Sequence, residues 1–362
     1  MSAPPLRRCD GQSFRWLALL ALFALAAPTA FAAEPARLAG RALGTTWTVK
    51  FVETAPLQDH ATLRALIAQK LEHLEQHFST YRANSELSRF NAAQSTDWID
   101  VSPELARVAA DSRSLSERSG GAFDATVAPL LTLWGFGPSG RGTSSIPTPA
   151  EISAARARVD YRELSVRLAP PALRKSRPDL AVDFSSMAKG FAVDTVSELL
   201  GSLGLTEHFV QIGGDIATAG TRIWRVGIEQ PTAPGVIAQT LELTDQALST
   251  SGDAHNRFER DGRRYSHLLD PRTGEPAQGP LASVSVVHDS CAVSSSLATA
   301  LFVLGAEAGY AFAVREEIAA LFIVRSNGML TLRPTPAFTE RFPSVPRTAT
   351  DVVGGVGIGA AN

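Results

Sequence analysis

The chain has 362 residues, 44% of them hydrophobic, and its 34 basic and 36 acidic residues give a formal net charge of −2. This much apolar sequence can bury a large core, as one large domain or two smaller ones. The near-neutral charge excludes the global basic field that attracts nucleic acid.

The first residues are typical of an export signal. Three arginines precede the apolar run at 16–27, and small residues follow up to an Ala30-Phe31-Ala32 cleavage motif. An uncleaved membrane anchor is the alternative, but the run is too short to span a bilayer comfortably. We therefore expect residues 1–32 to be a cleaved secretory signal and the mature protein to be periplasmic.

Cysteine usage fits export. Cys9 would leave with the signal, so the mature chain would keep only Cys291. A single thiol forms no internal disulfide, and stability must then come from packing.

The mature chain alternates between strand-like and helix-like segments. In chain order we predict a strand at 42–52, helices at 60–77 and 103–119, an exposed loop at 137–149, a helix opening at 148, a short strand and helix within 181–204, a strand broken by glycines at 208–220, strands at 223–231, 236–244 and 281–287, helices at 295–305 and 308–317, and a hairpin turning at Asn327-Gly328. No linker divides these elements. We expect one α+β domain over 33–345 with a mostly antiparallel sheet and flanking helices, then a flexible Gly/Ala-rich tail at 346–362.

Several segments rich in glycine and acidic residues have ordinary structural explanations when taken singly. Paired glycines often only make turns, Asp-Pro-Arg-Thr-Gly is a plausible tight turn, and Lys189 could be a solvated helix residue. A lone His267 is more often a surface or packed histidine than a catalyst. Neither GxGxxG nor a GxxxxGK[ST] phosphate loop is present.

Taken together and in order, these segments resemble the FAD:protein FMN transferase family, often called ApbE. The resemblance runs from about Gly44 to Phe342 and covers nearly the whole mature chain. The matching segments are GTTWTV, STYRANSELSRFN, GGAFDATVAPL, VDFSSMAKGFAVD, IGGDI, STSGD, HLLDPRTG and LATALFVLG.

The resemblance implies a phosphoryl transfer. FMN leaves FAD for a threonine hydroxyl of another protein, and AMP is released. A divalent cation such as Mg²⁺ would neutralise the diphosphate, and a base would take the proton of the hydroxyl.

The resemblance also implies roles for particular residues. His267 falls where the family keeps a histidine near the transferred phosphate and is the candidate base. Lys189 could approach the phosphates as a point charge, and Tyr81 could stack on a ring. The positions that match FAD contacts are Leu43, which stands where some members have methionine, Tyr81, Ala122, Phe123, Asp124, Asp183, Lys189 and Leu268.

The metal site is where this sequence departs from the family. Ser186 and Thr299 match positions that give oxygen to the cation, but Ser295 stands where the family has aspartate. A hydroxyl is a poorer magnesium ligand than a carboxylate. Asp289 could compensate if its loop bends back. One of Ser294, Ser295 and Ser296 is also expected to cap the helix, whereas a nucleophilic role is disfavoured because no GxSxG elbow surrounds them.

Three functions follow from the resemblance. The first is an Mg²⁺-dependent periplasmic FMN transferase whose acceptor is an exported or membrane-associated flavoprotein, such as a redox-pump subunit. The second is an FAD-binding carrier or docking protein with a degraded metal site. The third is an Mg²⁺-dependent FAD pyrophosphatase with water as acceptor. Retention of His267, Thr299, Lys189 and Asp124 favours the transferase.

Overall fold

The computed structural model describes Met1 and residues 34–53, 59–138, 146–233, 235–254, 256–260 and 262–343. The predicted signal peptide, apart from Met1, and the predicted C-terminal tail lie outside these residues.

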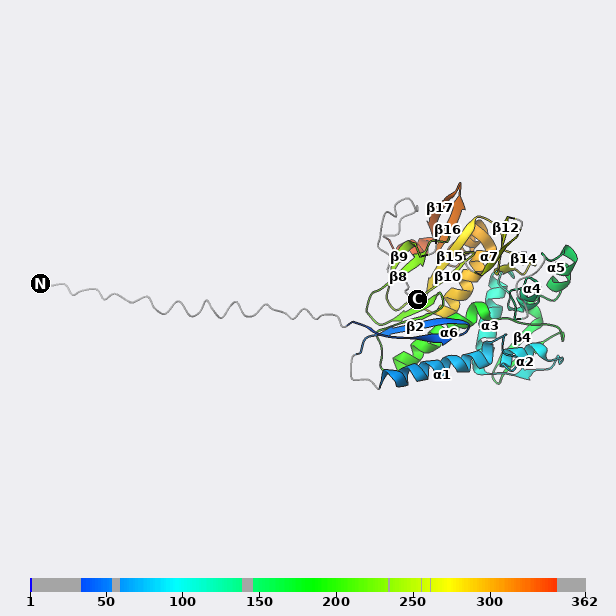
Figure 1. The fold of residues 1–362 in the computed structure, drawn as a ribbon, viewed down its shortest axis with the longest axis horizontal. Helices are drawn as coiled ribbons and strands as arrows, with labels where there is room; N and C mark the ends of the chain where they lie inside the picture. Colours follow the sequence, from blue (N-terminus) through cyan, green and yellow to red (C-terminus); the bar gives the residue numbers. More distant parts are fainter. Residues whose placement is uncertain are drawn as a thin grey trace. The chain divides into compact units, whose positions relative to one another are not determined.

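An eight-stranded sheet forms the centre of the fold (Figure 1). Its neighbouring strands all pair antiparallel, which confirms the predicted mostly antiparallel α+β class. The strand order is β1 (Ala36–Ala42), β2 (Thr45–Phe51), β6 (His208–Ile212), β7 (Asp215–Ala219), β10 (Ala247–Gly252), β15 (Leu281–His288), β16 (Ala319–Ser326) and β17 (Met329–Pro334).

Helices cover one face of this sheet. α6 (Ser185–Ser202) packs on β6 and β7, and α7 (Cys291–Arg315) packs on β10 and β15. α1 (His60–Phe78) and α3 (Pro103–Arg118) pack outside α6. In Figure 1 α6 lies between α1 and the strands. The two helices nearest the sheet, α6 and α7, also pack on each other.

The other face is covered by β8 (Trp224–Glu229) and β9 (Ile237–Leu243), with α8 (Pro336–Arg341) beside β16. Successive side chains of a β-strand point to opposite faces of the sheet. In β6, Val210 belongs to the core under α6, whereas Phe209 belongs to the core that contains Trp224. Apolar layers therefore hold the sheet from both sides.

Short elements complete the fold. They are α2 (Glu86–Ala92), β3 (Ile99–Asp100), two 3₁₀ turns (Ala125–Val127 and Tyr161–Glu163), α4 (Ala128–Leu133), α5 (Pro149–Arg156), β4 (Leu164–Leu168), β5 (Pro171–Lys175), β11 (Arg257–Arg260), β12 (Arg263–Ser266), β13 (Leu269–Asp270) and β14 (Glu275–Pro276). β3, β5 and β4 form a separate small sheet, and β11 with β12 forms a hairpin.

Two predicted helix starts are confirmed by their caps. The Ser102 hydroxyl accepts from the N–H of Leu105, with Pro103 in the first turn of α3. Thr148 and Glu151 form a reciprocal capping box at α5. The predicted hairpin at Asn327-Gly328 is confirmed, because both residues have the positive φ, 50° and 78°, that a two-residue turn needs.

One predicted strand is shorter than expected and another is absent. The strand predicted at 42–52 is confirmed over Thr45–Phe51, but Leu43 (φ 52°) and Gly44 (φ 70°) turn the chain between β1 and β2. The segment before α6 is an irregular loop, although Val182 is fully buried. Its backbone pairs with side chains instead of a strand: the N–H of Val182 donates to Oδ1 of Asn91 at 2.8 Å.

The long helix α7 joins the two predicted helices at 295–305 and 308–317. Gly305 lies between them with a non-helical φ of 85° and ψ of −178°, so the helix kinks there. By length and composition α7 could cross a membrane. Its apolar residues instead pack on β15 and β16 in the core, which accounts for its hydropathy.

Candidate functional site

The candidate site lies at one end of the sheet, where two turns meet. The Leu43-Gly44 turn leads into β2, and the Gly213-Gly214 turn joins β6 to β7. Gly213, with φ of 59°, donates its N–H to the carbonyl of Thr46 at 2.9 Å. This packing places the first residue of β7, Asp215, beside β10 and below α6 and α7.

The three predicted metal-binding residues come together. The Ser295 hydroxyl on α7 donates to the main-chain oxygen of Ser186 on α6 at 2.9 Å. Thr299 lies one turn further along α7, and its hydroxyl donates to the Ser295 carbonyl at 3.2 Å. Ser251 of β10 approaches Thr299, with 3.4 Å between the hydroxyl oxygens. At Ser186 the main-chain carbonyl faces this cluster.

Asp215 is the carboxylate of this cluster. Its Oδ2 lies 3.4 Å from the Ser295 hydroxyl, and the residue is 5% exposed. Burial raises the pKa of Asp215, while the nearby Lys189 charge and the hydroxyls of Ser249 and Ser295 oppose the rise. An oxygen cluster with one acidic group therefore lies between α6, α7, β7 and β10.

The three consecutive serines have three different contacts. Ser294 contacts Ser249 of β10, with 2.9 Å between the hydroxyl oxygens. Ser295 faces Ser186 and Asp215. The Ser296 hydroxyl donates back to the carbonyls of Ala292 and Val293, both at 3.0 Å. Only Ser295 thus belongs to the oxygen cluster.

The predicted cap of this helix is wrong. The helix cap is Ser290, whose hydroxyl accepts from Val293, so none of the three serines caps α7 and Ser295 lies in the second turn. Asp289, which could have compensated, is exposed in the loop before α7, whereas Ser295 is only 8% exposed. The carboxylate that lies next to the Ser295 hydroxyl is Asp215.

α6 holds the start of α7 through Asp194. Its carboxylate accepts from the N–H of Cys291 at 2.7 Å, the N–H of Ala292 at 3.0 Å and the Ser290 hydroxyl at 2.8 Å. These bonds satisfy N–H groups that a helix start leaves unpaired. At Gly190 a Cβ would lie 2.4 Å from the Cys291 carbonyl oxygen, so only glycine permits this approach. The two helices are thereby fixed at the point where Ser186 and Ser295 meet.

His267, the predicted base, follows the β11–β12 hairpin. Its Nδ1 lies 3.2 Å from the Asn256 carbonyl. A carbonyl only accepts, so Nδ1 carries the proton and Nε2 keeps a lone pair. Burial first, and then the Lys189 charge, lower the pKa of His267 to about 4. The ring packs edge-on against Phe136 with 6.2 Å between ring centroids. The imidazole is therefore neutral at pH 7.

Lys189 connects these groups. This half-buried side chain is near enough to affect the charge state of both His267 and Asp215. It follows Ser186 by one turn on α6, so α6 presents a carbonyl and a cation to the same region. Its ordinary explanation as a fully solvated helix residue does not hold.

Asp124 and Asp183 lie in segments that are bonded to each other, since the N–H of Asp183 donates to the Ala125 carbonyl at 2.7 Å. Both oxygens of Asp124 are already used, by Thr126 at 2.7 Å and by the N–H of Tyr161 at 2.9 Å. Burial raises the pKa of Asp124, and these bonds oppose the rise. Asp183 accepts from the N–H of Ser185 at the start of α6. Asp124 thus shapes the loop and Asp183 orients α6.

Three of the apolar residues predicted to contact FAD are buried. Ala122 is 1% exposed, Phe123 3% and Leu268 6%, and the last two share one core with α7. Because these side chains are buried, contacts to a ligand from these positions would use the main chain.

Leu43 and Tyr81 lie at the exposed side of the site. Glu75 of α1 links them: it accepts from the N–H of Leu43 and pairs with Arg82, the neighbour of Tyr81. Tyr81 itself is 73% exposed. A large aromatic ring held at the surface by an ordered backbone can stack on a planar ligand.

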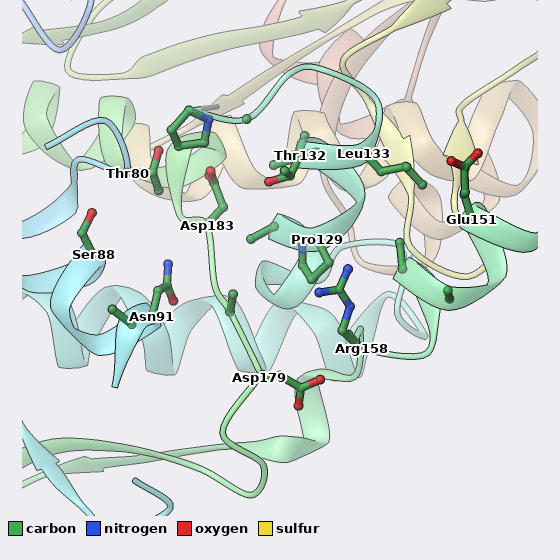
Figure 2. A pocket seen from close by; sticks show the side chains of 18 residues that line it. Thr80, Ser88, Asn91, Pro129, Thr132, Leu133, Glu151, Arg158, Asp179 and Asp183 are labelled. Atoms are coloured by element: carbon green, nitrogen blue, oxygen red, sulfur yellow. The ribbon is translucent and has the colours of Figure 1, made fainter. Parts of the chain in front are cut away.

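A cavity of about 620 Å³ opens next to Asp183 (Figure 2). Among the residues that line this cavity, Asp183 is the one that was predicted to contact FAD. Thr80, another lining residue, directly precedes Tyr81 in the chain. Figure 2 shows Thr80, Ser88 and Asn91 on one side of Asp183, with Thr132 and Pro129 on the other. Cavities of 300–1,000 Å³ are typical of small-molecule sites.

Comparisons with known proteins agree with this geometry. The model of the ApbE family matches residues 43–322. The chain belongs to the ApbE family. A Vibrio cholerae protein named FAD:protein FMN transferase is 39% identical over 317 residues, covering 86% of this chain and 94% of that protein. A Haemophilus influenzae protein of the same name is 35% identical, covering 84% and 90%.

Solved ApbE structures have the same fold. The flavinyl transferase ApbE of Pseudomonas stutzeri, in its apo form, superposes with a TM-score of 0.79 at 40% identity, covering 86% of this chain and 98% of that one. The flavin transferase ApbE of Vibrio cholerae gives 0.77 at 36% identity, covering 85% and 99%.

The donor set fits a magnesium ion of the kind that the ApbE resemblance implies. The described residues contain no group of three or more His, Cys, Asp or Glu side chains placed to hold a metal. The cluster offers instead a carbonyl, two hydroxyls and one carboxylate, all hard oxygens. Magnesium is commonly held by one or two carboxylates together with substrate phosphates, so this sparse set suffices.

Sequence reasoning missed two important residues of this ApbE site. Asp215 lay within the quoted IGGDI segment, and the signal was an acid directly after paired glycines at a strand start. Asp194 ended the quoted VDFSSMAKGFAVD segment. Neither residue could be given a role from the sequence, because the residues that they contact lie on α7, far along the chain.

Proposed function

We propose that this protein moves FMN from FAD to a threonine hydroxyl of an acceptor protein, with Mg²⁺ bound at the site, in the periplasm. The observation that carries the proposal is the oxygen cluster of Ser186, Ser295 and Thr299 between α6 and α7. Lys189 of the same helix α6 is close enough to influence His267, the proposed base. Membership of the ApbE family, whose relatives carry the transferase name, supports the same reaction.

The reaction balances with the groups present. The threonine oxygen attacks the FMN phosphorus, the bond to the bridging oxygen breaks, and AMP leaves with that oxygen. The threonine proton passes to Nε2 of His267, the ring nitrogen that keeps a lone pair. Lys189 balances negative charge on the diphosphate. When bound, Mg²⁺ would neutralise charge on the diphosphate and on the leaving AMP.

Binding of FAD would raise the pKa of His267, the proposed base. A pKa of about 4 makes His267 neutral but weakly basic. Part of that depression comes from Lys189, so a diphosphate that neutralises Lys189 would raise the pKa of His267 toward the working pH. The base would then become stronger when FAD is in place.

A transfer assay tests the proposal. The purified mature chain is incubated with FAD, Mg²⁺ and an exported flavoprotein carrying the target threonine, and products are measured by mass spectrometry. We expect the acceptor to gain the mass of FMN less one water, with one AMP per adduct. The matched control is the acceptor with its threonine changed to alanine, which should gain nothing.

The same assay separates the competing functions. Free FMN and AMP without any adduct would indicate a pyrophosphatase that uses water. Intact FAD that stays bound would indicate a carrier. Either result, obtained with an acceptor that another ApbE protein modifies, would contradict the transferase proposal.

The periplasmic part of the proposal is supported by the arginine-flanked apolar run at 16–27 and its cleavage motif. Expression of the full chain, followed by fractionation and N-terminal sequencing, tests it. We expect periplasmic protein beginning at Ala33. Full-length protein in the membrane fraction would indicate an uncleaved anchor instead.

A further inference from the structure

Asp215 is held in place by the sheet. It is the first residue of β7, directly after the Gly213-Gly214 turn. The pairing of Ile216 with Leu248 places Asp215 opposite Ser249 of β10. Because a β-strand fixes the side-chain direction, its carboxylate points to the face that α6 and α7 cover.

This buried carboxylate has no close cation. Among the residues that the structure describes, no ion pair within 4.0 Å involves Asp215. Its near neighbours are hydroxyls, with Lys189 acting from further away. A buried carboxylate without a paired charge is costly, and proteins retain such groups mainly where a ligand or ion completes them.

We propose that Asp215 supplies the carboxylate that position 295 lacks and, with the Ser186 carbonyl and the hydroxyls of Ser295 and Thr299, forms the magnesium site of this chain. The acidic ligand would then come from β7 instead of α7. The inference rests on the proposed function, because the diphosphate of FAD would complete the coordination.

The spacing of the oxygens agrees with this assignment. Neighbouring ligands of an octahedral Mg²⁺ with bonds of about 2.0–2.1 Å lie about 2.9 Å apart. The Ser295 hydroxyl is 2.9 Å from the Ser186 oxygen and 3.4 Å from Oδ2 of Asp215. Small side-chain movements suffice to bring the three oxygens around one cation.

The other acids near α7 are engaged or misplaced. Asp194 already accepts three hydrogen bonds from the start of α7. Asp289 is exposed in the preceding loop. Asp215 is thus the carboxylate that faces Ser295.

The experiment measures metal binding directly, using Mn²⁺ as a spin probe for the Mg²⁺ site. Free Mn²⁺ is followed by electron paramagnetic resonance in the presence of saturating FAD. The variants are Asp215→Asn, Ser295→Ala and the double change Asp215→Asn with Ser295→Asp, with Asp289→Asn as the matched control. FAD binding without metal, read by flavin fluorescence, is measured for every protein.

We expect Asp215→Asn to weaken Mn²⁺ binding at least ~10-fold, or ~1.4 kcal/mol. Ser295→Ala should cost less, the double variant should recover affinity, and Asp289→Asn should match the wild type. Thermal unfolding without metal should show Asp215→Asn to be no less stable than the wild type, because a buried charge is removed. If this variant does not fold, the inference is tested by the single change Ser295→Asp, which should gain little Mn²⁺ affinity because Asp215 already supplies the carboxylate.

Wild-type Mn²⁺ affinity in Asp215→Asn, or an equal loss in Asp289→Asn, would overturn the inference. Where only Ser295→Asp can be tested, a gain in Mn²⁺ affinity of ~10-fold or more would overturn it, because the site would then have lacked a carboxylate. Failure of FAD binding without metal would instead count against the proposed function. The two failures are therefore distinguishable.

Discussion

The two ends of the candidate site are built differently. The oxygen end is buried between α6, α7, β7 and β10, where Gly190 contacts the start of α7 and Asp194 accepts hydrogen bonds from it. The opposite end presents Tyr81, which is 73% exposed and held through the Glu72, Glu75 and Arg82 network. The buried end combines structural and chemical roles, whereas the exposed end can change its ligand contacts without affecting the core. Substitutions at the two ends should therefore affect different properties.

The largest effect is expected at His267, the proposed base. His267→Ala should lower the rate of FMN transfer by about 10²–10⁴-fold, because a general base acts in the transition state. FAD affinity should change little. Single-turnover transfer kinetics and a flavin fluorescence titration measure the two quantities. A variant with the wild-type transfer rate would make His267 structural.

Gly190→Ala tests how tightly the buried end is packed. The new methyl group would lie 2.4 Å from the Cys291 carbonyl oxygen, so α6 and α7 must separate. We expect a loss of about 1–3 kcal/mol in the free energy of unfolding and weaker Mn²⁺ binding. The control, Gly201→Ala in the same helix, meets nothing within 4 Å and should stabilise by about 0.5–1 kcal/mol. Equal effects of the two changes in urea titrations would contradict this packing.

Tyr81→Ala tests the exposed end. Stability should change by less than about 0.5 kcal/mol, because the side chain is mostly in solvent. FAD affinity should fall about 2- to 12-fold, which corresponds to the loss of one aromatic stacking contact of ~0.5–1.5 kcal/mol. Tyr81→Phe keeps the ring face and should bind FAD nearly as the wild type. A stability loss without an affinity loss would show that Tyr81 has a packing role.

A pH dependence of stability is also expected from His267. The folded protein holds the pKa of His267 near 4, below its ordinary value of 6.5. The unfolded chain therefore takes up this proton first as pH falls. Stability from this residue is complete above pH 6.5 and is lost as pH falls toward 4. Thermal unfolding of wild type and His267→Gln across this range should show the wild type losing more stability, and parallel curves would contradict the shift.

Sequence patterns predicted the elements that local signals define. Ser102-Pro103 and Thr148-Pro149 mark helix starts by their own capping chemistry, and Asn327-Gly328 marks a turn by its backbone preference. The turn at Leu43 was missed because the apolar alternation continues through it. The absent strand before α6 was missed because Val182 is buried without being in a sheet.

The resemblance to the family predicted which positions belong to the site. It did not predict which side chains from distant segments contact each other there. Ser186, Ser295 and Thr299 were expected together, and the structure brings them together. The carboxylate was not found, because Asp215 and Ser295 are 80 positions apart in the chain. Ser290 was passed over as the cap because three serines further on gave a stronger local signal. Contacts between distant segments depend on packing that no short pattern encodes.

The measurement that tests the account most directly is an FAD titration of the purified mature protein with and without Mg²⁺. If one FAD spans the exposed aromatic end and the buried oxygen end, binding should saturate at about one FAD per chain. Mg²⁺ should tighten it, since binding of the two ligands is reciprocally coupled. No saturable binding at tens of micromolar FAD, an affinity of roughly −6 kcal/mol or weaker, would contradict the proposed function.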